Sequence, residues 1–203
     1  MKKISFKILN LSLCMALISG IFLSLADFDA SCNELRNNVL RLHIIANSDS
    51  KEDQELKLKI RDEILKSSPD IFNNAKNIDD AVLEANKKTD EFLEIADKVI
   101  KENGFSYSAV VSVDDSYFET REYDDFVLPA GVYKSLIVKV GKAEGKNWWC
   151  VIFPEICLPT AQKGDLTDTV SASTAQIAKN PKKYIMRFKV VEIYEEIKNL
   201  KKQ

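Results

Sequence analysis

Polar and apolar residues alternate at two different periods in the part of the chain that follows residue 39. From Leu40 to Ala46 the alternation is one by one, which predicts a strand with Arg41 and His43 on one face. Ser50 then begins a capping-box pattern, so we expect a helix from Lys51 to about Lys66 that ends before the sequence SSPD. A strand, a turn and a helix therefore begin this region.

A longer helix and a group of strands are predicted next. Apolar residues at three- and four-residue spacing predict a helix over 78–100, and Gly104 ends it. The period then changes to two, which predicts strands at 105–113, 117–127, 133–140 and 148–153, with 141–147 as a hairpin-like loop. Residues 184–200 are expected to start with a short extended segment and to continue as a helix from about Val190. Because the turns are short, the predicted fold is α+β, a mainly antiparallel sheet with helices packed on one side.

The first residues have the pattern of an export signal. Three lysines precede an apolar run from Ile8 to Leu25, and Ser24 and Ala26 are small residues at the −3 and −1 positions of a signal-peptidase site. We therefore expect residues 1–26 to be a signal peptide cleaved after Ala26. The alternative is an N-terminal membrane anchor, because the run is near the minimum length that spans a bilayer.

Either alternative places the rest of the chain, from Asp27 onward, outside the cytoplasm. Residues 1–26 carry three lysines and no acid, so their removal lowers the formal charge from −2 to −5. A mildly acidic chain argues against nucleic acid as a partner, because phosphate binding needs a basic surface. No linker or repeat divides the remainder, so we expect a flexible segment over 27–38 and a single globular domain over 39–203.

Three cysteines follow the predicted cleavage site. Outside the cytoplasm a disulfide is chemically allowed, and Cys150 with Cys157 is the expected pair because Pro154 between them can turn the chain back. Two free buried thiols, or a metal site, are the alternatives that the sequence leaves open. Cys32 stands apart, near the new N-terminus.

His43 is the only histidine and the first candidate for chemistry. A hydrolase would need it as the base for Cys150, Cys157 or a serine, yet no nucleophile elbow or glycine-rich oxyanion loop accompanies it. Paired histidines, a C-x-x-C motif and phosphate-binding glycine patterns are absent from the sequence. We therefore expect no catalytic residue, no metal, no cofactor and no small-molecule substrate.

The predicted helix over 51–66 has an unusual surface. On a helical wheel its aliphatic residues form two stripes, and Gln54, Lys57 and Arg61 form a polar row between them. One interpretation is that Lys57 and Arg61 pair internally with carboxylates while their stems cover apolar surface. The other is a recognition stripe, in which aliphatic edges exclude water around polar contacts to a partner.

Trp148 and Trp149 are adjacent on a predicted strand and must point to opposite faces of the sheet. One therefore belongs to the core, and the other is either covered by a second layer or exposed as an interaction anchor.

Two long segments carry a resemblance to a known family. The sequences LRLHIIANSDSKEDQELKLKIRDEIL and LPAGVYKSLIVKVGKAEGKNWWCVIFPEIC resemble the two signature blocks of stage II sporulation protein R, a family of secreted signalling proteins of endospore-forming bacteria. The export segment and the C-terminal FKVVEIYEEIK are also similar to that family. The candidate partner-interaction or signature residues are Arg41, His43, Asn47, Ser48, Asp49, Gln54, Lys57, Arg61, Trp148 and Trp149.

The resemblance implies a ligand rather than an enzyme. It implies synthesis in the forespore, secretion into the intermembrane space, and activation there of a membrane-embedded aspartic-type protease that processes the pro-form of the early mother-cell sigma factor. The catalytic aspartates would belong to that partner. The alternatives are an exported hydrolase that uses His43 with Cys150, and a structural protein of the cell envelope.

Overall fold

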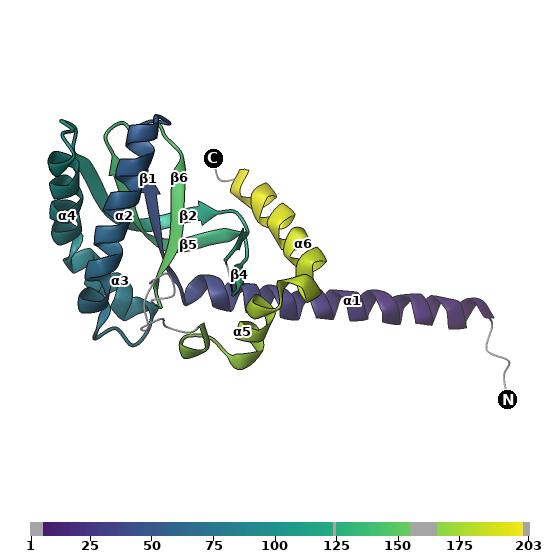
Figure 1. Cartoon of the computed structure of the whole chain (residues 1–203). Helices are drawn as coiled ribbons and strands as arrows, with labels where there is room; N and C mark the ends of the chain where they lie inside the picture. Colours follow the sequence, from purple (N-terminus) through teal and green to yellow (C-terminus); the bar gives the residue numbers. More distant parts are fainter. Residues whose placement is uncertain (1–5, 124, 155–165, 201–203) are drawn as a thin grey trace.

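A mixed four-stranded sheet lies between two groups of helices, and a long N-terminal helix projects from the domain (Figure 1). The computed structural model describes residues 6–123, 125–154 and 166–200. The strand order is β2-β5-β1-β6, and a separate two-stranded ladder pairs β3 with β4. The strands are β1 (Leu40–Ile45), β2 (Ala109–Phe118), β3 (Arg121–Glu122), β4 (Val127–Leu128), β5 (Gly131–Val140) and β6 (Asn147–Phe153). The helices are α1 (Phe6–Asn37), α2 (Lys51–Phe72), α3 (Ile78–Lys87), α4 (Thr89–Glu102), η1 (Leu166–Asp168), α5 (Ala172–Lys179) and α6 (Pro181–Leu200).

The predicted α+β class is confirmed and the sheet is mainly antiparallel, but helices pack on both faces of the sheet and not on one side as expected. β2 pairs with β5 and β6 pairs with β1 in antiparallel fashion, whereas the central pair, β1 and β5, is parallel. The loop 141–147 therefore does not form a hairpin, because β1 lies between the two strands that it joins. The sequence could not reveal this insertion, since β1 enters the sheet from about a hundred residues earlier in the chain.

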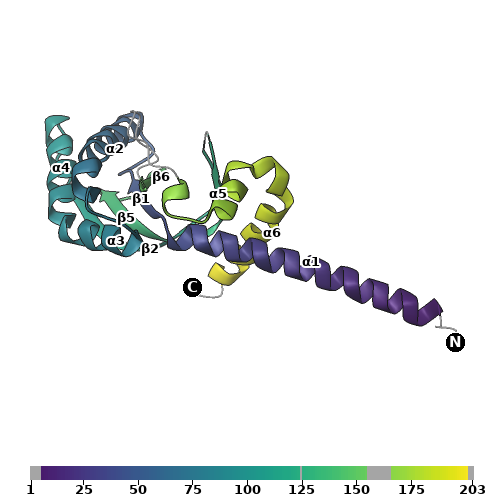
Figure 2. The same cartoon turned by 90° about the horizontal axis from the view of Figure 1, so that it is seen from below.

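Helices α2, α3 and α4 cover one face of the sheet (Figures 1 and 2). The alternation predicted for β1 is confirmed, because Leu40, Leu42 and Ile44 lie fully buried in the core that these helices form. The predicted capping box is also present: the Ser50 side chain accepts a hydrogen bond from the Asp53 backbone N–H at 3.2 Å. This satisfies one of the free N–H groups in the first turn of α2.

Two helix boundaries differ from the prediction. Helix α2 continues through Pro69 to Phe72, because Ile71 and Phe72 are buried in the core and their packing outweighs the hydrogen bond that proline cannot make. The single helix predicted over 78–100 is two helices, since the backbone leaves the helical region at Lys88, where φ is −106° and ψ is 12°.

The second half of the chain also departs from the expected pattern. The strand β2 extends to Phe118, and the strand expected over 117–127 is replaced by the two short segments β3 and β4. Residues 181–200 are helical throughout, so no extended segment precedes the C-terminal helix. Two apolar faces on α6 explain the ambiguity, because they remove the single-stripe periodicity by which a helix is recognised.

The second face of the sheet meets α1, α5, α6 and the β3–β4 ladder (Figure 2). Residues 27–37, expected to be flexible, form the last turns of α1 and are packed into this layer. Phe28, Cys32 and Leu35 are each 1% exposed or less. Phe28 contacts Phe188 of α6 edge-to-face, with 5.0 Å between ring centroids, so the first and last helices pack against each other.

Candidate functional site

The two segments that carry the family resemblance meet at one junction. The loop after β1 lies against the loop between β5 and β6, and each approaches too closely to admit a side chain on the other. A Cβ on Gly145 would lie 2.3 Å from the backbone oxygen of Ser48, and one on Gly141 would lie 2.3 Å from Oδ1 of Asn47. Gly141 also has a positive φ of 57°, which disfavours any other residue. Glycine at these two positions therefore allows the two loops to pack closely.

Asp53 is the centre of the hydrogen bonds at this junction. Its carboxylate accepts from Asn47 Nδ2 at 2.8 Å, from Ser48 Oγ at 2.5 Å, and from the hydroxyl of Tyr107. Burial opposes ionisation of this carboxyl, but these donors outweigh it and hold the pKa of Asp53 below its usual value. The same interaction and burial raise the pKa of Tyr107.

Further polar contacts at the junction use Asp49, Gln54 and Lys57. The backbone N–H of Lys146 donates to Asp49 Oδ1 at 2.7 Å, and Gln54 Nε2 donates to the Ser48 carbonyl at 2.8 Å. Lys57 Nζ donates to Gln54 Oε1 at 2.6 Å and to the Lys146 carbonyl at 2.9 Å. Burial lowers the pKa of Lys57, but both acceptors stabilise its ammonium group. Within the described residues, Lys57 is thus paired internally, but with an amide oxygen and a carbonyl oxygen and not with the carboxylate that the first interpretation expects.

Arg61, the third member of that row, is different. Its guanidinium is partly exposed, binds Asp62 at 2.6 Å, and lies 5.1 Å from the ring centroid of the half-buried Trp148. Leu58 beside it is also partly exposed. Arg61, Trp148 and Leu58 make an accessible patch of mixed character on the helical face of β6, and its role in recognition stays a prediction.

The predicted opposite directions of the two tryptophans are confirmed. Trp148 packs with the core under α2, whereas Trp149 packs with Phe118 and His43 on the other face. Arg121 lies over the Trp149 ring at 4.0 Å. Trp149 is therefore covered by a second layer and by a cation rather than left fully open.

Arg41 is fully buried on the same face as Trp149. Its guanidinium lies 3.8 Å from the centroid of the Phe118 ring and 4.8 Å from that of Tyr133, and Nη2 donates to the Tyr123 hydroxyl at 2.8 Å. Among the described residues, Nε and Nη1 have no hydrogen-bond partner, and no carboxylate forms an ion pair with the group. In the part of the chain that the structure describes, aromatic rings therefore lie against most of this charge.

His43 lies beside Arg41 and on the opposite face of the sheet from Cys150. Its Nε2 is 2.9 Å from Asn147 Oδ1, and burial, with the charge of Arg41, keeps the pKa of His43 low. His43 pairs with Trp149 across the β1–β6 ladder, whereas Cys150 pairs with Leu42 and points into the opposite core. The expected alternative in which His43 activates Cys150 is therefore wrong, because the sheet separates the two side chains.

Cys150 is buried and is in a disulfide. Its predicted partner Cys157 lies outside the described residues, so the pairing stays a prediction. In the part of the chain that the structure describes, no cluster of three or more His, Cys, Asp or Glu residues could hold a metal ion.

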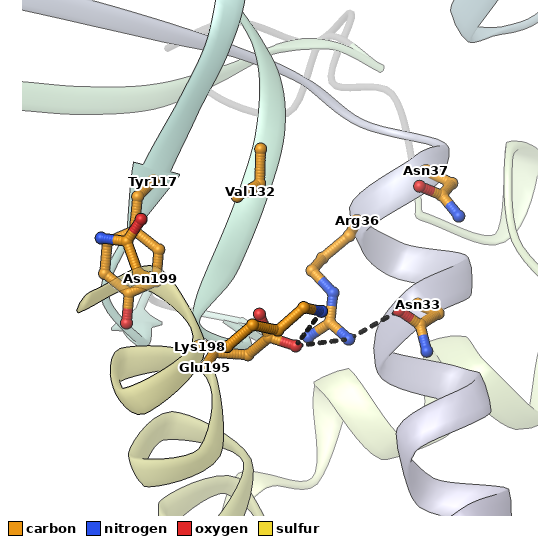
Figure 3. Close-up of a pocket in the computed structure, with 8 residues that line it drawn as sticks. All are labelled: Asn33, Arg36, Asn37, Tyr117, Val132, Glu195, Lys198 and Asn199. Carbon is orange, nitrogen blue, oxygen red and sulfur yellow. Dashed lines mark hydrogen bonds and ion pairs between the residues drawn. The ribbon is translucent and has the colours of Figure 1, made fainter. Parts of the chain in front are cut away.

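A cavity of about 160 Å³ lies where α1, α6 and the edge of the sheet meet (Figure 3). Arg36 and Glu195, both buried, form an ion pair at 3.8 Å across it, and Arg36 also donates to the Ala130 carbonyl at 2.9 Å. Sequence reasoning missed this pair, because an arginine in a segment expected to be flexible gives no signal of a buried partner 159 positions later. The pair fastens α6 to α1 and leaves little unsatisfied charge for a ligand.

Helix α1 is long and apolar enough to cross a membrane over Ile8–Asn37, with a mean hydropathy of 2.2 in its most apolar window. None of that window is buried in the domain. A signal sequence near an N-terminus has the same properties, so α1 fits either a signal peptide or an anchor.

Comparison with known proteins identifies the family to which these features belong. The pattern of the family described as Stage II sporulation protein R (spore_II_R) matches residues 36–163. The chain is also 32% identical, over 155 residues, to "Stage II sporulation protein R" of Bacillus subtilis (strain 168), covering 73% of this chain and 69% of that protein. The chain belongs to the stage II sporulation protein R family. No solved structure matches it.

The residues that match the family form the sheet and the helices on one of its faces. It begins at Arg36 and includes every described strand, α2, α3, α4 and the whole junction around Asp53. It leaves out the apolar part of α1 and the two C-terminal helices. A sporulation role for this chain follows from its family, and the junction belongs to the matched part.

Proposed function

We propose that this stage II sporulation protein R family member is an exported signalling protein that activates a membrane-embedded aspartic-type protease. That protease then processes the pro-form of the early mother-cell sigma factor. The observation that carries the proposal is the family match over residues 36–163, which includes both signature segments and the junction between them. The sporulation protein acts as a ligand, and the catalytic aspartates are those of the protease.

The N-terminal helix supports the proposed location. Synthesis takes place in the forespore, and α1 directs the domain into the space between the two membranes, either as a cleaved signal or as a retained anchor. In both cases the folded domain faces the membrane in which the protease resides. The accessible patch of Arg61, Trp148 and Leu58 is the part of the signature segments that we propose meets the protease.

The geometry of the candidate chemical groups is consistent with a ligand. Lys57 bonds to the loop between β5 and β6, Asp53 and Gln54 bond to the loop after β1, and His43 is separated from Cys150 by the sheet. A role as a structural envelope protein would not depend on the amount of protease or of pro-sigma factor. This difference separates it from the signalling role.

Co-expression of the full chain with the protease and the pro-sigma factor tests the proposal. We expect processed sigma factor to accumulate only when all three are present and to increase with the amount of this chain. A protease with a substituted catalytic aspartate is the control, because it keeps the partner but removes its chemistry. Equal processing with and without this chain would refute the proposal.

A further inference from the structure

Helix α6 has two apolar faces, and only one of them is covered. The inner face contacts α1 and the sheet: Phe188, Val191 and Glu195 are buried, and Tyr184 stacks on Phe28 at 5.8 Å. The outer face lies roughly opposite at about 100° per residue, and its apolar side chains are exposed. Its residues, each between 49% and 77% exposed, are Met186, Val190, Ile193, Ile197 and Leu200.

The spacing of this outer seam, which is defined by those five residues, is that of a coiled coil. Successive members are four, three, four and three residues apart, so they occupy a and d positions of two heptads. Val190 and Ile197 take the a positions, where β-branched residues favour two-stranded pairing. An apolar stripe at this spacing fits the seam of a helix pair, but an amphipathic helix on a lipid surface has the same spacing, so the charges beside the seam decide the occupant.

The charges beside the seam indicate which helix. Lys189 and Glu196 occupy successive g positions, and in an antiparallel pair g positions face each other across the seam. With Val190 of one copy against Ile193 of the other, Lys189 of each copy faces Glu196 of its partner. Two opposite-charge pairs then form in exchange for the exposed 2.6 Å ion pair that Lys189 makes with Glu192 of its own copy.

We infer that the outer seam of α6 binds the same seam of a second copy of this chain, in an antiparallel pair with two-fold symmetry. Such an interface is isologous, so one self-complementary stripe is sufficient to form it. A helix of 20 residues is about 30 Å long, and one helix pair of that length buries less surface than a permanent dimer requires. The pair is therefore a reversible dimer. Retention of α1 in a membrane would raise its population by increasing the effective concentration.

This pairing is independent of the proposed signalling role, since it depends only on α6. Sedimentation equilibrium of the full chain in density-matched detergent micelles measures it. We expect the protein mass to rise from one copy to two as the concentration increases. Ile193→Glu, in the centre of the seam, should weaken the dimer at least about tenfold. Ile185→Glu is the matched control, because Ile185 is equally apolar and 66% exposed on the same helix but lies outside the seam.

Charge reversal distinguishes self-pairing from other occupants. Lys189→Glu and Glu196→Lys should each weaken the dimer, and the double variant should restore it to within about twofold of the original affinity. A monomer at every concentration would overturn the inference. So would equal loss in Ile193→Glu and Ile185→Glu, failure of the double variant to restore dimerisation, or an effect of Ile193→Glu on bound detergent alone, which would indicate a lipid surface. Circular dichroism of each variant verifies that α6 is folded.

Discussion

The guanidinium of Arg41 lies over the ring of Phe118, and neither side chain is exposed to solvent. A buried cation without a carboxylate is expensive, because the aromatic attraction returns only about 0.5–2 kcal/mol against several kcal/mol of lost hydration. Within the described part of the chain, one hydrogen bond to Tyr123 is the other compensation for this charge. Arg41 is thus a poor choice for stability alone.

Arg41→Met should therefore leave the free energy of unfolding unchanged or raise it by about 1–3 kcal/mol, because an apolar side chain of similar length needs no compensation. Tyr123→Phe should instead lower it by about 1–3 kcal/mol, because the charge stays buried and loses its bond. Urea denaturation of the two variants measures this contrast. A decrease of more than about 2 kcal/mol in the free energy of unfolding of Arg41→Met would contradict the expectation.

The close approach of Gly145 to Ser48 leads to a second prediction. Gly145→Ala places a methyl group 2.3 Å from a backbone oxygen, and a backbone cannot move aside as a flexible side chain can. We expect a loss of about 1–3 kcal/mol in the free energy of unfolding, as for other overpacked sites. Gly20→Ala in α1 is the control, because nothing lies within 4 Å of the added atom. Equal stability of the two variants would show that the signature loops are not in this contact.

Asp53 should make stability depend on pH in acid. Its pKa is lowered on folding from an ordinary value of 3.8, so its contribution is present above that value and is lost as the pH falls through the lower, folded value. Asp53→Asn should cost about 1–3 kcal/mol at neutral pH and should flatten the loss of stability below about pH 4. The exposed Asp70 on the same helix provides the control variant Asp70→Asn, whose acid profile should follow the wild type. Denaturation curves recorded between pH 2 and pH 7 measure the free energy of unfolding of the wild type and both variants. An Asp53→Asn profile that follows the wild type in acid would contradict the prediction.

Local patterns in the sequence were sufficient for elements whose signals are local. The Ser50 cap, the alternation of β1 and the opposite directions of Trp148 and Trp149 depend on neighbours within a few residues, and the structure has them. The insertion of β1 between β5 and β6 depends on contacts about a hundred residues apart, which periodicity does not encode. The burial of residues 27–37 was hidden for the same reason, since their partners are in α6.

The candidate site shows the same division. The sequence grouped Gln54, Lys57 and Arg61 into one row, but tertiary contacts divide it. Gln54 bonds to the loop after β1, Lys57 bonds to the facing loop, and Arg61 lies over an aromatic ring at the surface. The internal bond of Lys57 depends on the position of the second signature loop, and the whole sheet fixes that position.

Arg61→Ala should separate recognition from folding. Its partly exposed guanidinium contributes about 0.5–1 kcal/mol through Trp148, so the free energy of unfolding should change little. If the patch contacts the protease, processing of the pro-sigma factor should fall at least about fivefold, because the variant loses at least one contact of the interface. Lys66→Ala, an exposed position on the same helix, should leave both quantities unchanged. Full processing by a folded Arg61→Ala variant would remove Arg61 from the interface without affecting the family assignment.

The reactivity of the Cys32 thiol reports whether the end of α1 is packed into the domain. The thiol is fully buried among Phe28, Phe188, Val191 and Val127, although the sequence suggested a mobile position. In the native chain it should react with iodoacetamide at least about tenfold more slowly than in urea, because reaction requires local opening of α6. Phe188→Ala leaves a cavity over the sulfur and should increase the labelling rate, whereas Ile185→Ala on the exposed side of α6 should not. Mass spectrometry of the peptide containing Cys32 identifies the labelled thiol, and labelling as fast as in urea would mean that α6 does not hold α1.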